Sequence, residues 1–292
     1  MSAIITLTTD FGFADAYVAA MKGVILGINP EAKIIDICHS IKPQNITQAA
    51  FILSTAYPYF SEKTIHLVVV DPEVGTERRA IILKTPLAYF VAPDNGVLSY
   101  VIGQSLAKPV MEKGTVSLRE KTKPGVDIEV VAITNPKFWR SPVSATFHGR
   151  DIFAPVAAAL SLGFSPIEFG EPIDSVWVLP LPRSSQGSDG MLVGHILHID
   201  NFGNLITDIK SDNLTLKAED ITIEVGGQLI FGLSGTYAEG SELLALIGSS
   251  GYLEISLNGG SASSLLDVRM GDEVRLRRQS GANQRTGLSP PA

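Results

Sequence analysis

The first 70 residues alternate between short runs of apolar, often β-branched residues and segments whose apolar residues recur at helical spacing. Such a β-α-β-α-β order implies right-handed crossovers and predicts a mostly parallel sheet with helices on its faces. The expected strands are 4–8, 33–37 and 65–70, and the expected helices start near Asp15 and Asn45 and end near Asn29 and Ala56. Strands at 80–83, 89–92 and 128–133 and a helix at 152–160 extend the pattern, so residues 1–178 are predicted to form an α/β domain.

The pattern changes near residue 180. Residues 179–190 are rich in proline, serine and glycine and have no apolar period, which is typical of a linker. The next segments are short and alternate between apolar and polar residues, with glycine-containing turns between them, at 192–199, 221–225, 242–247 and 252–257. Because no helix is predicted there, residues 191–278 are expected to form a smaller all-β, barrel-like domain. Residues 279–292 are polar and are expected to be a disordered tail.

Composition narrows the class of function. The formal charge of −7 argues against broad nucleic-acid binding, which needs a basic face. No apolar run approaches the roughly 18 residues that span a bilayer, and the N-terminus lacks the basic region of a signal peptide. Cys38 is the only cysteine, so an intramolecular disulfide is impossible. We therefore expect a cytoplasmic protein without nucleic-acid or membrane partners.

Two acidic motifs follow predicted strands. In a parallel sheet, ligands bind outside the carboxyl ends of the strands, and Asp10 and Asp71 both lie at such ends. If both strands belong to one sheet, the two acids share an edge. Turn formation by Asp10 and helix capping by Asp15 are ordinary explanations for these residues. The functional alternative is a pair of acceptors for ribose hydroxyls or an ammonium group.

Asp71 ends a run of valines, and Arg78 follows seven residues later. A strand-end turn with a surface ion pair explains this spacing. A catalytic acid held by its own counter-ion explains it equally well, and the sequence pattern by itself leaves both interpretations open.

His148 lies between a predicted loop and the start of a predicted helix, with Gly149 beside it and two charged residues after it. We interpret the other histidines as structural. The chain has no phosphate-binding G-x-x-x-x-G-K-[ST] loop, no dinucleotide-binding glycine motif, no G-x-S-x-G elbow and no Cys/His zinc spacing. A divalent-metal hydrolase built from Asp10, Asp15, Asp71 and His148 stays open.

Several polar turns interrupt the C-terminal part, at 199–205, 248–254 and 257–260. Composition favours simple hairpin turns there. Their small residues and amides, which include Asn204, Ser249, Tyr252 and Gly259, are the alternative lining of a ligand pocket.

A set of short motifs, each weak alone, is specific in its order and combination. The chain resembles the S-adenosyl-L-methionine hydroxide adenosyltransferases, the adenosine-forming hydrolases related to the adenosylmethionine fluorinases and chlorinases. The resemblance spans about residues 3–276. It rests on Thr9-Asp10-Phe11-Gly12-x-x-Asp15, Cys38-His39-Ser40, Asp71-Pro72-x-Val74-Gly75-Thr76-x-Arg78-Arg79, Ala92-Pro93-Asp94-Asn95-Gly96, Thr146-Phe147-His148-Gly149-Arg150-Asp151, Phe202-Gly203-Asn204 and Gly251-Tyr252-Leu253.

This resemblance implies a homotrimer with active sites between the N-terminal domain of one subunit and the C-terminal domain of the next. It implies that Asp71, Arg78 and His148 activate water, that Asp10 binds the ribose hydroxyls and that Asp15 binds the methionine ammonium. It also implies substrate contacts from Asn95, Asn204, Ser249, Tyr252 and Gly259. No cofactor and no metal are expected, because S-adenosyl-L-methionine is the substrate. One departure is Glu73, at a position where the family motif more often has glycine.

The predicted reaction is hydrolysis of S-adenosyl-L-methionine to adenosine and L-methionine by attack of water at ribose C5′. An ionised Asp71 beside the nucleophile would repel a halide, and the resembling halogenases carry an uncharged residue there. They also carry an insertion after this motif, whereas a short segment joins Arg79 to Asp94 here. The alternatives are a halogenase, a divalent-metal hydrolase and a non-catalytic adenosyl- or adenosine-binding protein.

Overall fold

The computed structural model describes residues 3–105, 119–214, 218–239 and 242–278. The chain divides into two compact units, Met1–Leu181 and Pro182–Ala292. This division falls inside the segment 179–190 that was expected to be a linker, and the short strand β10 (Ser185–Gln186) within that segment pairs with β11. The tail predicted at 279–292 lies outside the described residues.

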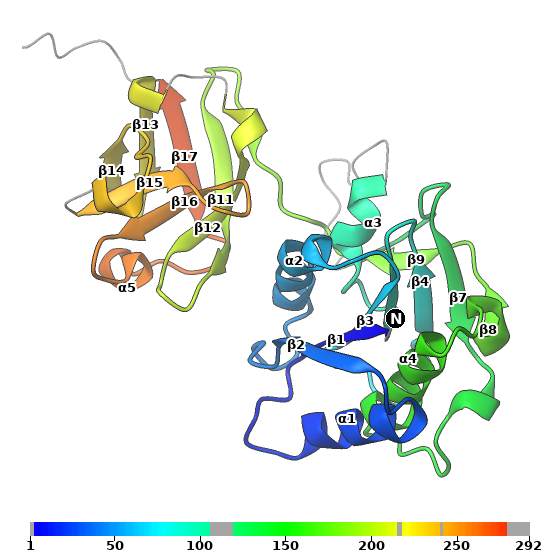
Figure 1. The fold of residues 1–292 in the computed structure, drawn as a ribbon. Coiled ribbons are helices and arrows are strands. Elements are labelled where there is room, and N and C mark those ends of the chain that lie inside the picture. Colours follow the sequence, from blue (N-terminus) through cyan, green and yellow to red (C-terminus); the bar gives the residue numbers. More distant parts are fainter. Residues whose placement is uncertain (1–2, 106–118, 215–217, 240–241, 279–292) are drawn as a thin grey trace, which may run out of the picture. The chain divides into compact units, whose positions relative to one another are not determined.

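A seven-stranded sheet forms the centre of the N-terminal unit, in the order β2-β1-β3-β5-β4-β7-β8 (Figure 1). The pairs β2–β1, β1–β3 and β3–β5 are parallel, whereas β4 and β8 run against their neighbours. The mostly parallel sheet predicted from the alternating pattern is therefore confirmed. The strands are β1 (Ile4–Thr9), β2 (Lys33–Cys38), β3 (Thr64–Val69), β4 (Ala80–Lys84), β5 (Ala88–Pro93), β7 (Glu129–Ile133) and β8 (Gly170–Pro172); β6 (Glu120–Thr122) and β9 (Val176–Val178) form a separate pair.

Helices cover both faces of this sheet. The continuous apolar run of β3 serves two cores, because Leu67 and Val69 pack with α1 and α4 while Val68 and Val70 pack with α2 and α3. The helices are α1 (Tyr17–Ile28), α2 (Ile46–Ala56), α3 (Ser99–Ser105) and α4 (Ala154–Ser161). No helix in the described part of the chain is long and apolar enough to cross a membrane.

Two helix starts differ from the sequence prediction. Capping of α1 by Asp15 is wrong, since the helix begins at Tyr17 with Ala16 as its N-cap. The helix expected at 152–160 is preceded by a π-helical turn, η3 (Gly149–Phe153). Pro155 has no N–H to donate to the carbonyl of Asp151, and the N–H of Arg140 donates to that carbonyl instead, at 2.8 Å.

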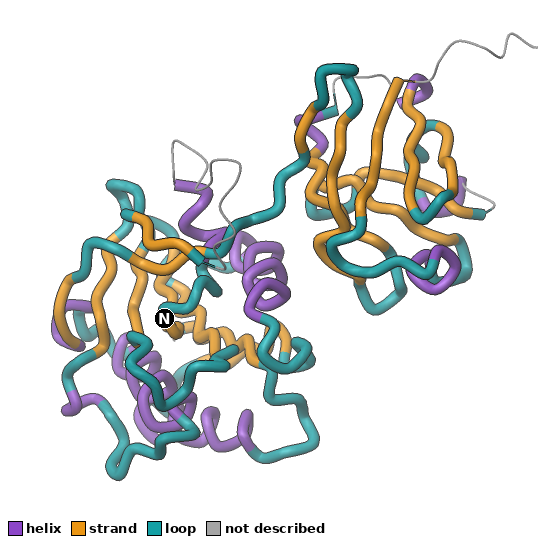
Figure 2. The backbone as a smooth tube through the Cα atoms, turned by 180° about the vertical axis from the view of Figure 1, so that it is seen from behind, coloured by secondary structure: helices purple, strands orange, loops and turns teal. Residues whose placement is uncertain are grey.

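The C-terminal unit is an antiparallel sheet of eight strands, and Figure 2 shows how little helix it contains. After β14, the N–H of Ser234 donates to the carbonyl of Ala245 in β15 at 2.8 Å, which brings the two ends of the sheet together as in a barrel. The expected barrel-like domain is thus confirmed, and the short α-helix α5 (Ala262–Leu266) in it was not predicted. Besides β10, its strands are β11 (Leu192–Ile199), β12 (Leu205–Lys210), β13 (Ile221–Val225), β14 (Gln228–Phe231), β15 (Leu243–Ile247), β16 (Tyr252–Leu257) and β17 (Glu273–Arg278).

Candidate active site at the edge of the N-terminal sheet

The carboxyl ends of β1 and β3 lie side by side, because the two strands are parallel neighbours with Thr9 opposite Val69. Asp10 and Asp71, which follow these strands, therefore leave the sheet at the same edge, as the topology argument predicted. Asn95 braces this edge. Its buried side-chain amide donates to the carbonyl of Val70 at 2.9 Å, and its carbonyl oxygen accepts the N–H of Val97. Asn95 thus supports the backbone next to Asp71.

Asp71 and Arg78 form a buried ion pair, and both side chains are only 5% exposed. The Nε of Arg78 donates to both carboxylate oxygens of Asp71 at 3.0 Å, and its Nη2 donates to Oδ2 at 2.5 Å. The turn that joins them passes through Gly75 at φ +80°, where a Cβ would collide with the carbonyl oxygen of Ala145. The interpretation as an exposed surface ion pair is therefore wrong.

His148 binds the same guanidinium group from a distant part of the chain. It is the N-cap of η3, and its Nδ1 lies 2.9 Å from Nη2 of Arg78. A guanidinium group can only donate, so Nδ1 is the acceptor and the ring proton of the neutral imidazole sits on Nε2. Burial lowers the pKa of His148, and the positive charge of Arg78 lowers it further against the opposing effect of Asp71. The imidazole is therefore neutral at pH 7, with Nε2–H available as a donor.

The loop that carries Asp10 and Asp15 packs against the segment that carries His148. The ring of Phe147 contacts Phe11 and Tyr17, with centroids 5.8 and 5.1 Å away. Asp10 accepts the N–H of Gln44 at 2.7 Å through one carboxylate oxygen. Asp15 is exposed on the same loop. The segment that carries both acids thus packs, through Phe11 and Tyr17, on the residue next to His148.

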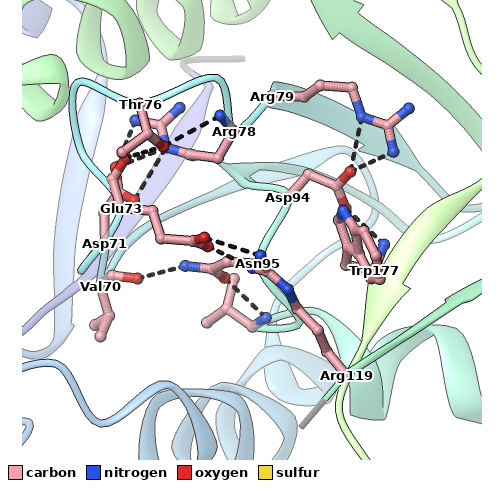
Figure 3. A network of polar contacts seen from close by, with 11 residues as sticks. Val70, Asp71, Glu73, Thr76, Arg78, Arg79, Asp94, Asn95, Arg119 and Trp177 are labelled. Carbon is pink, nitrogen blue, oxygen red and sulfur yellow. Dashed lines mark hydrogen bonds and ion pairs between the residues drawn. The ribbon is translucent and has the colours of Figure 1, made fainter. Parts of the chain in front are cut away.

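Buried polar groups outside the predicted site residues also hold this edge together. His39, interpreted as structural, is 1% exposed and lies 2.8 Å from the hydroxyl of Thr9 through its Nδ1. Asp94 is 2% exposed and accepts from Arg79 and from the N–H of Trp177. Burial raises the pKa of Asp94, although these donors oppose the effect. Figure 3 shows Asp94 with Arg79 and Trp177 beside the Asp71–Arg78 pair.

Glu73 belongs to the same network. Its carboxylate accepts two hydrogen bonds from the guanidinium of Arg119, and that interaction holds the pKa of Glu73 below its usual range (Figure 3). Arg119 directly precedes β6, which pairs with β9, and it lies 46 residues after Glu73. The sequence pattern therefore gave no sign that the two side chains meet.

The C-terminal residues singled out from the sequence fall into two groups within their own unit. Asn204 and Gly259 lie near the Leu257 end of β16, because Leu205 pairs with Ile255. Ser249 and Tyr252 lie at its other end, a strand length of roughly 17 Å away. Burial raises the pKa of Tyr252, and the nearby charge of Asp208 adds to this. A ligand that reached both groups would extend along the strand.

Asp200 supports Asn204 in the turn at 199–205, and the sequence analysis did not assign it this role. One carboxylate oxygen accepts the N–H groups of Phe202 and Asn204 at 2.9 Å, and the other accepts the side-chain amide of Asn204 at 3.0 Å. Between them, Gly203 has φ +84° and a Cβ there would strike Ser261. Asp200 therefore orients Asn204, and an acid at the start of a polar turn was the available signal.

The donors proposed for a metal do not form a ligand set. Both oxygens of Asp71 and Nδ1 of His148 face the guanidinium of Arg78, which carries positive charge where a metal ion would have to bind. Throughout the described ranges, His, Cys, Asp and Glu side chains form no group of three that could hold a metal ion.

Comparison with known families gives two matches that follow each other along the chain. Residues 5–170 match the SAM hydroxide adenosyltransferase N-terminal domain, and residues 194–275 match the SAM hydroxide adenosyltransferase C-terminal domain.

Individual relatives agree with these matches. An (R)-S-adenosyl-L-methionine hydrolase of Methanocaldococcus jannaschii is 38% identical over 288 residues, covering 94% of this chain and 95% of the relative. A crystal structure of an uncharacterized conserved protein from Thermotoga maritima has a TM-score of 0.81 and 36% sequence identity. The match covers 94% of this chain and 100% of that protein. A fluorinase of Nocardia brasiliensis is more distant, at 25% identity over 309 residues. That match covers 94% of this chain and 96% of the fluorinase.

Proposed function

The chain belongs to the SAM hydroxide adenosyltransferase family, and from that membership we propose how it hydrolyses S-adenosyl-L-methionine to adenosine and L-methionine. The observation that carries the mechanism is one buried guanidinium group, on Arg78, which binds a carboxylate and a neutral imidazole at the carboxyl edge of the sheet. This arrangement provides an acceptor and a donor for one water molecule.

The reaction is a displacement at ribose C5′. A lone pair on the water oxygen forms the new bond to C5′, and the electrons of the C5′–S bond move to the sulfonium sulfur, which leaves as neutral methionine. The sulfonium is a good leaving group, so the difficulty lies in the weak nucleophile. A positioned carboxylate that accepts a proton from the water raises its reactivity.

Asp71 takes this role. Arg78 fixes its carboxylate and balances its charge, and each oxygen retains lone-pair sites for a further hydrogen bond. His148 orients the same water through its Nε2–H, since its Nδ1 already accepts from Arg78. The proton leaves the water toward Asp71 and then to solvent, and the imidazole stays neutral.

The remaining predicted residues hold the substrate at its two ends. Asp10 binds the ribose hydroxyls and Asp15 the methionine ammonium, beside the His148 segment. The two groups along β16 match a ligand with two polar ends, with Asn204 and Gly259 at one end and Ser249 and Tyr252 at the other. We place these contacts in a neighbouring copy of the chain, in a homotrimer, as the family resemblance implies.

Water, and not a halide, is the nucleophile of this proposal. At about 4 Å, two like charges in a partly buried site repel by roughly 4 kcal/mol, which an ionised Asp71 would impose on any halide bound beside it. Water has no net charge, and it can donate a hydrogen bond to the same carboxylate.

The decisive experiment incubates the protein with S-adenosyl-L-methionine in ¹⁸O-labelled water and separates the products. We expect adenosine and methionine in equal amounts, with the label in the 5′-hydroxyl of adenosine. Added chloride or fluoride should yield no halogenated adenosine, and a chelator should leave the rate unchanged. Tight binding without turnover would support the binding-protein alternative, and loss of activity with chelator would support the metal hydrolase.

A further inference from the structure

Besides Asp71, the turn that ends at Arg78 carries two further acids, Glu73 and the exposed Glu77. Besides Arg119, the positive charge of Arg78 also acts on Glu73. Asp71 is hydrogen-bonded to Arg78, whereas Glu73 is held by Arg119. Something must decide which acid receives the guanidinium.

Arg119 engages Glu73 completely. Its Nη2 donates to Oε1 of Glu73 at 2.8 Å and its Nη1 donates to Oε2, so both oxygens face away from Arg78 (Figure 3). Side chains of this pair are about one-third exposed, whereas those of the Asp71–Arg78 pair are 5% exposed. The outer pair thus occupies Glu73, the acid on this turn whose pKa the charge of Arg78 also lowers.

The position of Arg119 is fixed by the rest of the network. Its Cζ lies 4.9 Å from the centroid of the Trp177 ring, and the N–H of Trp177 donates to Asp94 at 2.8 Å. Asp94 in turn accepts from Arg79, the residue next to Arg78. The contacts therefore form a continuous series from Glu73 through Arg119, Trp177 and Asp94 to Arg79. This series joins the turn before Arg78 to the residue after it.

We propose that Arg119 is a positioning residue that keeps Glu73 away from Arg78, so that Asp71 is the acid to which Arg78 donates. The inference rests on the hydrolysis proposed above. It also gives a reason for the acid at position 73, since Glu73 and Arg119 together fasten the turn to the β6–β9 pair while cancelling each other's charge.

The test is a double-mutant cycle on the whole chain. Arg119→Gln should lower kcat at least 10-fold while changing KM for S-adenosyl-L-methionine less than 3-fold, because the freed Glu73 carboxylate draws Arg78 away from Asp71. The double variant Glu73→Gln/Arg119→Gln should recover to within about 3-fold of wild-type kcat, because the competing charge is gone. Lys84→Gln, which removes a cation from the exposed Lys84–Glu129 pair, is the matched control.

Two results would overturn the inference: wild-type kcat in Arg119→Gln, or a double variant no more active than Arg119→Gln at equal melting temperature. Absence of hydrolysis in the wild type would instead contradict the proposed function. A crystal structure of Arg119→Gln tests the inference without turnover, since the Glu73 carboxylate should move onto Arg78. An unchanged Asp71–Arg78 pair, with Glu73 still directed away, would reject it.

Discussion

Arg78 binds two acceptors of different character, a carboxylate on its own turn and an imidazole from residue 148. The carboxylate keeps the charge, and the imidazole keeps its proton on Nε2. In the proposed mechanism, this division gives Asp71 the acceptor role and His148 the donor role, which the sequence pattern left open. Burial lowers the pKa of His148, and the positive charge of Arg78 lowers it further.

Asp71→Asn should lower kcat by roughly 10²- to 10⁴-fold, because the amide cannot take a proton from the attacking water. KM should change much less, since in the proposed mechanism Asp71 contacts the water and not the adenosyl group. Measuring adenosine release under saturating substrate checks both values.

Glu77→Gln is the control for charge loss on this turn, because Glu77 is an exposed acid one residue before Arg78. It should retain wild-type turnover. Comparable activity in Asp71→Asn and Glu77→Gln would reject the water-activation role of Asp71.

Single residues also show where the sequence was informative. The seven-residue spacing of Asp71 and Arg78 predicted their pairing, because a strand end and one turn suffice to bring them together. His148 came from the family motif, since 70 residues separate it from Arg78 and the contact exists only in the folded sheet. Arg119 was missed for the same reason, and Asn95 proved to brace the backbone at Val70.

At the level of elements, the strand-end turn after β3 and the π-helical turn before α4 place the three site residues. Long apolar runs and helical periods predicted most of the N-terminal sheet, because burial on both faces leaves a strong signal. Short or charged strands were missed. β17 (Glu273–Arg278) alternates valine and leucine with exposed charges, and β12 (Leu205–Lys210) directly follows the polar turn at Asn204.

Gly75→Ala tests the strand-end turn. Gly75 and Gly190 have almost the same φ, +80° and +79°, but a Cβ at Gly75 meets the carbonyl oxygen of Ala145 whereas a Cβ at Gly190 meets nothing within 4 Å. Gly75→Ala should therefore destabilise the protein by about 1–3 kcal/mol more than Gly190→Ala. Calorimetry of both variants measures this difference.

Turnover separates the two glycine variants further. Gly75→Ala should also lose kcat, because the shifted turn carries Asp71 and Arg78, whereas Gly190→Ala should keep it. Equal stability and equal turnover of the two variants would show that the turn tolerates displacement.

For the whole molecule, the proposed site draws on both compact units, with the Asp71 trio in Met1–Leu181 and the β16 contacts in Pro182–Ala292. The sequence predicted two domains, because composition and periodicity change together near residue 180. Which copy of the chain supplies each half of a site is a property of the assembly, and the proposed trimer makes it testable.

Mixing two inactive variants tests the shared site. If Asp71→Asn and Asn204→Ala damage opposite halves, subunits exchanged at equal ratio should form fully intact sites at about one quarter of positions. Recovery to about one quarter of wild-type activity is expected after unfolding and refolding the mixture. If the mixture stays inactive after subunit exchange has been verified, both halves of each site come from the same copy of the chain.

The pH dependence of stability depends on a buried histidine away from the site. His66 is fully buried among aromatic rings and accepts or donates one hydrogen bond with Thr6, and burial lowers its pKa to about 4. Between pH 6.5 and 4 the unfolded chain binds a proton that the folded chain does not. The free energy of unfolding should therefore fall with decreasing pH in this window, by roughly 3 kcal/mol in total.

Urea unfolding of wild type and His66→Phe at pH 7 and pH 4.5 measures this contribution. The phenylalanine variant keeps an aromatic ring in the cluster and removes the titrating group, so its stability should fall less on acidification. Parallel pH profiles would mean that His66 becomes protonated without unfolding.

The stacking of Arg119 on Trp177 has an optical consequence. The chain contains only two tryptophans, so in a Trp139→Phe variant all indole emission comes from Trp177. The Arg119 guanidinium over the ring, which the Glu73 carboxylate holds, affects the emission, so any shift of the Asp71 turn that loosens Arg119 should change it. Stopped-flow fluorescence on substrate addition would then report, in real time, whether the turn moves before the bond to sulfur breaks.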